Sequence, residues 1–295
     1  MNSKLSDRIA TGVFVAIAVI IVALLFSLLG YILFKGLSVF PENFLTKPSS
    51  TYGSGGGIRD QLFNSFYMLV LTMIITIPLG VGGGIYMAEY ARPGRLTDIV
   101  RTCIEVLASL PSIVIGVFGL LVFVQLTGWG YTLIGGALAV SIFNLPVMVR
   151  VTEDAIRNVP GDQKQASLAL GVTKWHTIKT VLVPAAIPSI ITGAILAAGR
   201  VFGEAAALLF TAGQVTSRVD YGNWNPFSDN SPLNPFRTAE TLSVHIWAVE
   251  TQSTLQNTEI VAGAAAAVLV ICVLIFNLLA RLLGSVIYKK LTATK

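Results

Sequence analysis

The chain has 295 residues, of which 54% are hydrophobic and only 12% are charged, and its mean hydropathy is +0.75. Soluble globular proteins carry about 25% charged residues, so a surface that faces water on all sides is excluded. The net charge of +5 comes without a basic stripe interleaved with aromatic residues, which excludes a nucleic-acid-binding protein of the usual kind, and two histidines exclude a His-rich metal site. The composition predicts a polytopic membrane protein.

The first apolar segment, about Ile9–Phe34, follows Lys4 and Arg8 as a signal peptide would. It is too long for a signal-peptide core and lacks a small-residue cleavage site, so we interpret it as a retained span. Five further segments are each long enough to cross the hydrocarbon as a helix. They are about Leu62–Tyr90, Cys103–Leu126, Tyr131–Val149, Pro184–Ala212 and Val261–Ile287. Because lipid cannot satisfy an open sheet edge, we expect an all-α integral membrane fold with about six transmembrane helices.

The connections between these segments orient the chain. Lys and Arg are about three times as common in the connections on the side of the N-terminus as in those on the other side, which predicts that both termini are cytoplasmic. We expect an N-terminal helix with an external connector at residues 1–60, followed by a core at residues 61–295. The external loop at about 213–259 contains Asn-Pro and Ser-Pro steps, which predict a partly ordered cap over the outer mouth, with His245 in solvent.

The glycine-rich stretch 53–57 lacks the GK[ST] ending of a Walker loop, and a flexible connector is expected there. No other Walker motif occurs, so the chain is not expected to be an ATPase itself.

A long cytoplasmic connection, about residues 150–183, is expected to form short helices. Small residues and leucines favour a helix that stops and turns at Gly171, and Val172 and Trp175 begin a second short helix with an apolar side. Such a helix pair could dock into a groove of a soluble partner, or it could pack back onto the membrane helices of its own chain. The residues that would make the docking contact are Gln165, Ala166, Ser167, Gly171, Val172 and Trp175.

Two features inside the spans are candidates for a substrate path. Pro111 and Ser112 mark a break in the third span, and broken helices are tolerated where they line a cavity. Arg200 and Glu204 lie four residues apart in the fifth span, so on one helix they would share a face and could pair. They are then either a structural ion pair or an anion contact, in which Arg200 offers its planar fork to the anion and Glu204 holds it in place.

The cytoplasmic loop resembles the coupling loop of ABC importer permeases, which reads EAA, three residues, Gly, nine residues, then Ile-x-Leu-Pro. Ala166, Gly171 and Pro184 match at this spacing, whereas Gln165 replaces the Glu and Ser167 replaces the second Ala. Other stretches resemble phosphate-uptake permeases, and the last of them resembles the PstA type in particular. These stretches are Gly56–Ile58, Pro78–Val81, Ile85–Tyr90, Leu110–Gly116, Ala169–Trp175 and Gly199–Ala212.

This resemblance implies the ABC importer permease fold, a bacterial or archaeal-type inner membrane, and inorganic phosphate as substrate. It also implies a heterodimer with a PstC-type permease, two PstB-type subunits that bind ATP and Mg²⁺, and a PstS-type phosphate-binding protein outside. The chain itself would hold no cofactor. Two alternatives remain: a permease of the same architecture for another oxyanion or solute, and a secondary transporter or intramembrane enzyme. The second is disfavoured because neither paired inverted repeats nor a nucleophile with a paired base is evident.

Overall fold

The computed structural model describes residues 3–38, 40–49, 56–215, 219–252 and 257–293. These residues form helices, turns and irregular loops, and no β-strand occurs among them. By length and composition, five of the described helices could cross a membrane, or six if a bent pair counts as one span. The prediction of an all-α membrane fold with about six spans is therefore confirmed. The glycine-rich stretch 53–57 lies mostly outside the described residues.

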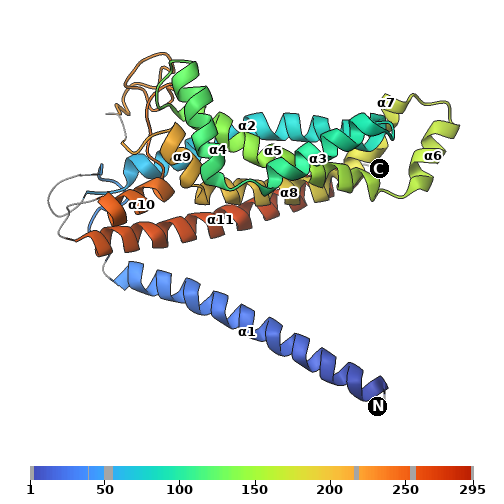
Figure 1. Cartoon of the computed structure of the whole chain (residues 1–295), viewed down its shortest axis with the longest axis horizontal. Helices are drawn as coiled ribbons and strands as arrows, with labels where there is room; N and C mark the ends of the chain where they lie inside the picture. The colour runs from blue at the N-terminus through green and yellow to red at the C-terminus, as the bar shows by residue number, and fades with distance from the viewer. Residues whose placement is uncertain (1–2, 39, 50–55, 216–218, 253–256, 294–295) are drawn as a thin grey trace.

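The first helix, α1 (Ser3–Ser38), stands apart from the rest of the molecule and approaches it at one end only (Figure 1). That end crosses α11 (Thr258–Ala293) so closely that a Cβ at Gly36 would lie 2.3 Å from the carbonyl oxygen of Gly263. Small residues permit such close approach of two membrane helices. Because α1 is apolar all round and nearly all of its described side chains are exposed, its surface requires lipid or another apolar helix.

The centre of the molecule is the packing of α2 (Arg59–Ile85) against α5 (Leu133–Arg157). Glycines of α2 make this contact possible, because a Cβ at Gly80 would lie 2.5 Å from Met148 Cβ and one at Gly84 would lie 2.4 Å from Thr152 Cβ. The helix α8 (Val183–Gly203) covers α5, and α11 in turn packs on α8. At its other end α2 continues into one π-helical turn, η1 (Tyr86–Tyr90).

The third apolar segment is broken as predicted. The amphipathic helix α3 (Arg95–Ser109) meets α4 (Ser112–Gly119) at 101°, and α4 continues as the π-helical turn η2 (Leu120–Leu126). The bend falls at Leu110, whose extended backbone is the conformation that a following proline favours. The predicted start of this segment at Cys103 is wrong, because the helix begins at Arg95 and its polar face interrupts the apolar run.

The fifth segment is not the continuous helix Pro184–Ala212 that we expected. Helical structure begins earlier, in α7 (Lys174–Thr177) and η3 (Ile178–Leu182), and continues through α8 to Gly203. Glu204 is then extended (φ −72°, ψ 119°), and a short helix, α9 (Ala206–Thr211), follows. Small residues allow α9 to lie against α4, since a Cβ at Gly116 would come within 2.9 Å of Ala207 Cα.

The segment 219–241 and α10 (Leu242–Gln252) form a cap at one end of the molecule, which we call the outer cap. It is more ordered than predicted, because its polar side chains bond to the start of α2. The prediction that His245 is in solvent is wrong: the residue is 7% exposed, and its Nδ1 lies 3.1 Å from Oε1 of Glu240.

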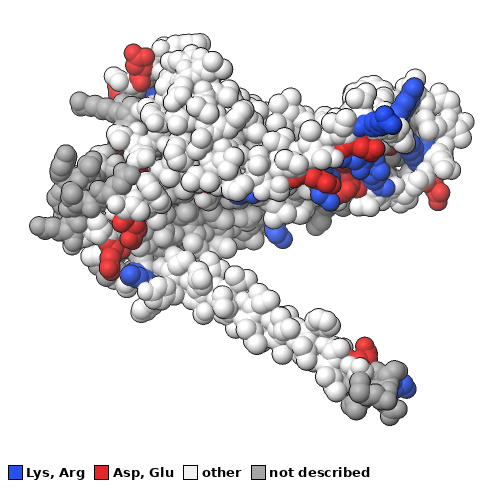
Figure 2. Space-filling model, in the orientation of Figure 1, with Lys and Arg blue, Asp and Glu red and all other residues white. Residues whose placement is uncertain are grey.

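Charged side chains gather at the two ends of the long axis and leave a band between them with few charges (Figure 2). The start of α1 and the end of α11 lie toward the same end, which also carries α6 (Gly161–Ala169) and α7 (Figure 1). The opposite end carries the outer cap. A membrane around the uncharged band therefore leaves both ends of the chain on one side, as the predicted topology requires.

Candidate functional site

A helical hairpin projects from the end of the molecule opposite the outer cap (Figure 1). It consists of α6, a turn at Gly171, and α7, and we call it the coupling hairpin. Gly171 has φ +77°, a left-handed conformation that glycine adopts without a steric penalty. Thr173 caps α7, its hydroxyl accepting from the backbone N–H of His176 at 3.4 Å. The predicted helix–turn–helix is present, but Val172 precedes the second helix, which begins at Lys174.

The hairpin turns its large apolar side chains away from the membrane core. Leu170 is 83% exposed and Trp175 is 60% exposed. Gln165 and Ala166 are exposed as well, whereas Ser167 is half-buried and its hydroxyl lies 2.9 Å from that of Thr177. Packing back onto the membrane helices, the alternative that the sequence left open, would bury the apolar side chains that are exposed here. The exposed apolar side chains are typical of a surface that binds another protein.

Arg200 lies in the last turn of α8, nearer to the end of its helix than the sequence suggested. Its guanidinium carbon is 3.4 Å from the centroid of the Phe143 ring, a cation–π contact, and the residue is exposed. The predicted ion pair with Glu204 is not present, although the structure describes both residues. The two do not share a helix face, because α8 ends at Gly203, between them.

Glu204 has a different role from the one expected. Its carboxylate is buried, and Oε1 accepts from the backbone N–H of Ala207 at 3.1 Å, which caps α9. Its carbonyl oxygen accepts from the hydroxyl of Ser243 at 2.6 Å, so the same residue ties α10 of the outer cap to the break between α8 and α9. The break is therefore stabilised by hydrogen bonds that a continuous helix would not need.

Ser112 is the first residue of α4 and is half-buried. Within the described structure, no hydrogen bond, ion pair or ring contact joins it to Arg200 or Glu204. The two broken spans nevertheless meet, because α9 packs against α4. Irregular backbone at membrane depth occurs where it is buried in protein or lines a cavity, so the paired breaks mark the part of the fold best suited to a path.

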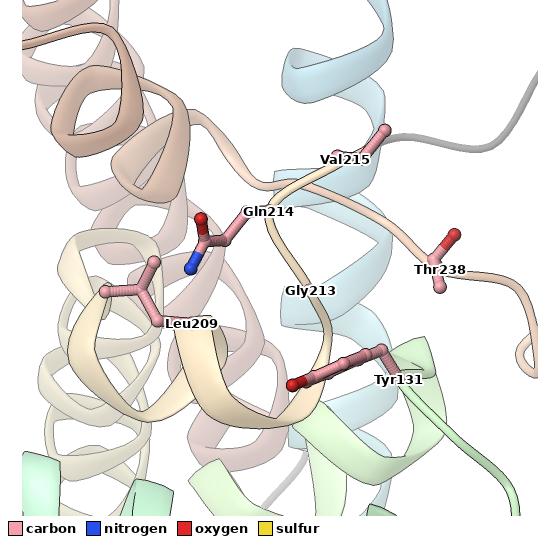
Figure 3. A pocket seen from close by; sticks show the side chains of 6 residues that line it. All are labelled: Tyr131, Leu209, Gly213, Gln214, Val215 and Thr238. Carbon is pink, nitrogen blue, oxygen red and sulfur yellow. The ribbon is translucent and has the colours of Figure 1, made fainter. Parts of the chain in front are cut away.

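A cavity of about 280 Å³ opens where α9 ends and α5 begins. In Figure 3 the side chains of Tyr131 and Gln214 extend toward the side occupied by Leu209, whereas the side chain of Thr238 is turned away. Gly213, with φ +101°, makes the turn at its edge. None of its described lining residues is charged; they are Tyr131, Leu209, Gly213, Gln214, Val215 and Thr238. No local pattern in the sequence indicates this cavity, because it depends on a turn after α9.

A buried arginine, which was not among the predicted functional residues, connects the outer cap to the start of α2. Arg237 is 5% exposed and donates to Oδ1 of Asn64 at 2.6 Å and to the carbonyl oxygen of Pro232 at 3.1 Å. Burial lowers the pKa of its guanidinium from the ordinary value. Nearby, Gln61 donates to Oε2 of Glu240 at 2.7 Å. One pattern in the sequence could have indicated this polar contact: Gln61 and Asn64 lie at helical spacing at the start of an apolar helix.

Two buried carboxylates near the other end were also missed. Glu153 on α5 lies 2.5 Å from a guanidinium nitrogen of Arg101 on α3 and 2.9 Å from one of Arg157. Glu89 in η1 meets two lysines of the coupling hairpin. In the described part of the chain, no group of three or more His, Cys, Asp or Glu side chains is placed to hold a metal ion.

A helical membrane core with broken spans and a projecting helical hairpin is the architecture of ABC importer permeases. One chain of a bacterial alginate ABC transporter superposes with a TM-score of 0.67 over 96% of both chains at 14% identity. A chain of the MetNI methionine ABC transporter superposes with a TM-score of 0.57 over 77% of this chain and 93% of that one, at 18% identity. Likeness at such low identity shows the fold alone.

The chain belongs to the family of binding-protein-dependent transport system inner membrane components, whose profile matches residues 80–293. It is 67% identical over 293 residues to a probable ABC transporter permease of Bacillus subtilis, YqgI, covering 99% of this chain and all of the relative. It is 31% identical to the phosphate transport system permease protein PstA of Yersinia pestis, over 84% of this chain and 77% of that protein. The chain is thus a multi-pass permease subunit of an ABC importer.

Proposed function

We propose that this chain is a PstA-type subunit that forms half of the path for inorganic phosphate in an ATP-driven importer. The observation that carries the proposal is the 31% identity to PstA of Yersinia pestis over 84% of the chain. The name of the Bacillus subtilis relative states no solute. The methionine and alginate transporters share the fold at low identity and do not bear on the substrate.

Arg200 is the proposed anion contact of the path. Within the described structure no carboxylate lies within ion-pair distance of Arg200, and one face of its guanidinium lies on the Phe143 ring. The stacking orients the planar group while its edge, which carries the N–H donors, stays free to bind two oxygens of a phosphate. An exposed site of this kind binds weakly enough to release the ion, as conduction requires.

Glu204 and Ser112 contribute to the same path indirectly. Glu204 keeps α9 in place against α4, and Ser112 offers a hydroxyl at the first residue of α4. In this proposal a PstC-type permease supplies the other half of the path, and a PstS-type protein delivers phosphate to the outer cap. The membrane is the inner membrane of a bacterial or archaeal-type cell.

The coupling hairpin is the proposed docking element for a PstB-type subunit, two of which would bind ATP and Mg²⁺ and hydrolyse ATP for the complex. Leu170 and Trp175 offer an exposed apolar surface to a groove of that subunit. Gln165, Ala166, Ser167 and Val172 lie on or beside the same hairpin. This chain then has no ATPase activity of its own, and its termini and hairpin are cytoplasmic.

Uptake by the reconstituted four-component complex in liposomes tests the proposal. Labelled phosphate should accumulate inside the liposomes only when ATP is present on the side of the ATP-binding subunits. Excess unlabelled phosphate should reduce this accumulation, whereas excess sulfate or amino acids should not. Accumulation of another oxyanion or solute in place of phosphate would assign this permease to that substrate.

Variants of Arg200 test the path itself. Arg200→Gln should abolish most phosphate uptake at unchanged complex yield, and Arg200→Lys, which keeps the charge but loses the fork, should retain part of it. Arg281→Gln, at an exposed arginine of α11, is the matched control and should transport normally. Full uptake by Arg200→Gln would show that Arg200 is not an anion contact.

The variant Glu204→Gln distinguishes a role of Glu204 as hydrogen-bond acceptor for α9 from a role as partner in an ion pair. A glutamine side chain still offers an oxygen to the N–H of Ala207, so this variant should keep uptake and yield. Glu204→Ala leaves the buried N–H of Ala207 without this acceptor, which should cost about 1–3 kcal/mol and lower complex yield. Equal loss in both variants would mean that the charge of Glu204 matters in its own right.

A further inference from the structure

A single buried carboxylate joins the coupling hairpin to the membrane core. The side chain of Glu89, in η1, is 6% exposed. Nζ of Lys164 on α6 lies 2.8 Å from both of its oxygens and donates to Oε1; the geometry at Oε2 is not aligned for a hydrogen bond. Nζ of Lys174 on α7 lies 3.6 Å from Oε2. A buried carboxylate requires such partners, because burial disfavours an unpaired charge.

Further contacts converge on the same short segment. Lys174 also donates to the backbone carbonyl of Glu89, and its Nζ lies 4.8 Å from the ring centroid of Tyr90. Arg157, at the end of α5, donates to the carbonyl oxygen of Met87 at 3.3 Å. The five residues of η1 are thus where α2, α5, α6 and α7 are joined. Single π-helical turns of this kind are frequent at functional positions.

The two helices of the hairpin bury little of their own surface: in α7 Thr177 is buried. The residues of α6 are all described and none is buried. The exposed Leu170 and Trp175 point outward and make no core. Covalently, α6 follows α5, and α7 continues through η3 into α8. Chain connectivity therefore links a movement of the hairpin to α5 and α8, both of which pack on α2, whereas Glu89 joins the side chains of the hairpin directly to η1 at the end of α2.

We propose that Glu89 is a positioning residue that fastens both helices of the coupling hairpin to the end of α2, so that movement of the hairpin also moves α2. The inference rests on the proposed docking of the hairpin to an ATP-hydrolysing subunit. Since α2 packs along α5 and begins under the outer cap, this connection carries a displacement at the cytoplasmic end into the centre of the permease.

Hydrogen exchange of the full chain in lipid nanodiscs, without other subunits, tests the fastening alone. Glu89→Gln should raise amide exchange in residues 161–177 about tenfold, because loss of the paired charge frees the hairpin to open locally. Glu259→Gln is the control; it removes an exposed carboxylate that lies 3.6 Å from Lys35, and it should leave exchange in 161–177 unchanged. Wild-type exchange in Glu89→Gln would overturn the proposal, whatever the transported solute proves to be.

The ATP hydrolysed per phosphate transported by the assembled complex tests the consequence. Glu89→Gln should keep ATPase subunits bound but raise this ratio severalfold. Lys164→Glu, which sets two carboxylates against each other, should be worse, whereas Lys164→Arg, which keeps a cation at the same position, should stay close to the wild-type ratio. If Glu89→Gln does not assemble, Lys164→Gln combined with Lys174→Gln removes the same contacts from half-exposed positions.

An unchanged ratio in Glu89→Gln, or equal ratios in Lys164→Glu and Lys164→Arg, would overturn the coupling role of Glu89. A wild-type complex that neither binds ATPase subunits nor transports phosphate would instead overturn the proposed function. The exchange result would then still decide whether Glu89 fastens the hairpin.

Discussion

The outer cap and the coupling hairpin are both connections between membrane helices, and both expose large apolar side chains, but only the cap also buries a set of polar groups in the described structure. The outer cap buries its polar groups: Arg237 is 5% exposed, and Glu240 and His245 lie beside it in sequence and are buried as well. The hairpin exposes its apolar groups, with Leu170 and Trp175 turned outward. Polar groups that are buried and hydrogen-bonded within the chain hold the cap in one shape, whereas the hairpin, all of whose residues are described, has no such buried polar network to hold it.

The contacts that attach the two regions to the membrane helices also differ in how buried they are. The cap is held by buried hydrogen bonds at the start of α2: Gln61 and Asn64 donate to Glu240, and Asn64 accepts from Arg237. The hairpin is held by lysines that remain half-exposed, at 37% and 44% of their side-chain surface. Buried hydrogen bonds are costly to break, and half-exposed ion pairs are less so, which suits a rigid cap and a movable hairpin.

The largest effect is expected from Arg237→Ala in the outer cap. The substitution leaves the buried carbonyl of Pro232 without its donor and removes the donor 2.6 Å from Asn64, which should cost about 2–4 kcal/mol. Thermal unfolding of the purified chain in detergent should show a clearly lower midpoint. Lys179→Ala, at an exposed residue near the hairpin, should leave the midpoint unchanged. Equal midpoints for the two variants would contradict the view of the cap as rigid.

Substitutions at the turn of the hairpin should change the stability of the chain little but impair its function. Gly171→Val places a β-branched residue at φ +77°, which costs about 1–2 kcal/mol, although no atom lies within 4 Å of the added Cβ. ATPase binding and uptake should fall while the chain still inserts and unfolds near the wild-type temperature. Gly171→Asn, which accepts this backbone conformation more readily, should lose less; equal uptake in both variants would mean that the turn does not matter.

Trp175→Ala tests the docking surface with a smaller change. The ring is 60% exposed, so its removal should leave the stability of the isolated chain within about 0.5 kcal/mol of wild type. Affinity for the ATP-hydrolysing subunit should fall by about tenfold or more, since exposed aromatic residues often dominate interfaces. Pull-down at graded subunit concentrations measures this loss. Phe227→Ala, at a residue of the outer cap that is 93% exposed, is the control and should bind normally.

The smallest effect concerns Tyr221 of the outer cap, whose hydroxyl donates to Oδ1 of Asp60 at 2.8 Å. Burial, together with this hydrogen bond, raises its pKa from 10.0 to about 12. Between these values the unfolded side chain loses its proton first, so the tyrosine's contribution to stability is present below pH 10 and is lost as the pH rises toward 12. Tyr221→Phe should have a slightly lower midpoint of thermal unfolding at neutral pH. Its midpoint should also fall less than that of the wild type as the pH rises from 10 toward 12.

The sequence by itself determined the features that depend on neighbouring residues. Apolar runs long enough for the bilayer fixed the class of fold, because hydropathy and length act locally. The bend at Leu110 follows from the proline after it, and the turn at Gly171 from the freedom of glycine. The docking role of Trp175 is also a prediction from local patterning and stays a prediction; the structure shows that this side chain is exposed.

Only the tertiary structure decided which polar groups meet. Local spacing suggested an ion pair between Arg200 and Glu204, but the helix ends between them and Glu204 caps α9 instead. Glu89 finds Lys164 75 residues further along the chain, and Arg237 lies 173 residues from Asn64. A periodic pattern shows which face of a helix is polar, but not what that face will contact. Burial makes the pairing obligatory, and the packing of distant segments chooses the partner.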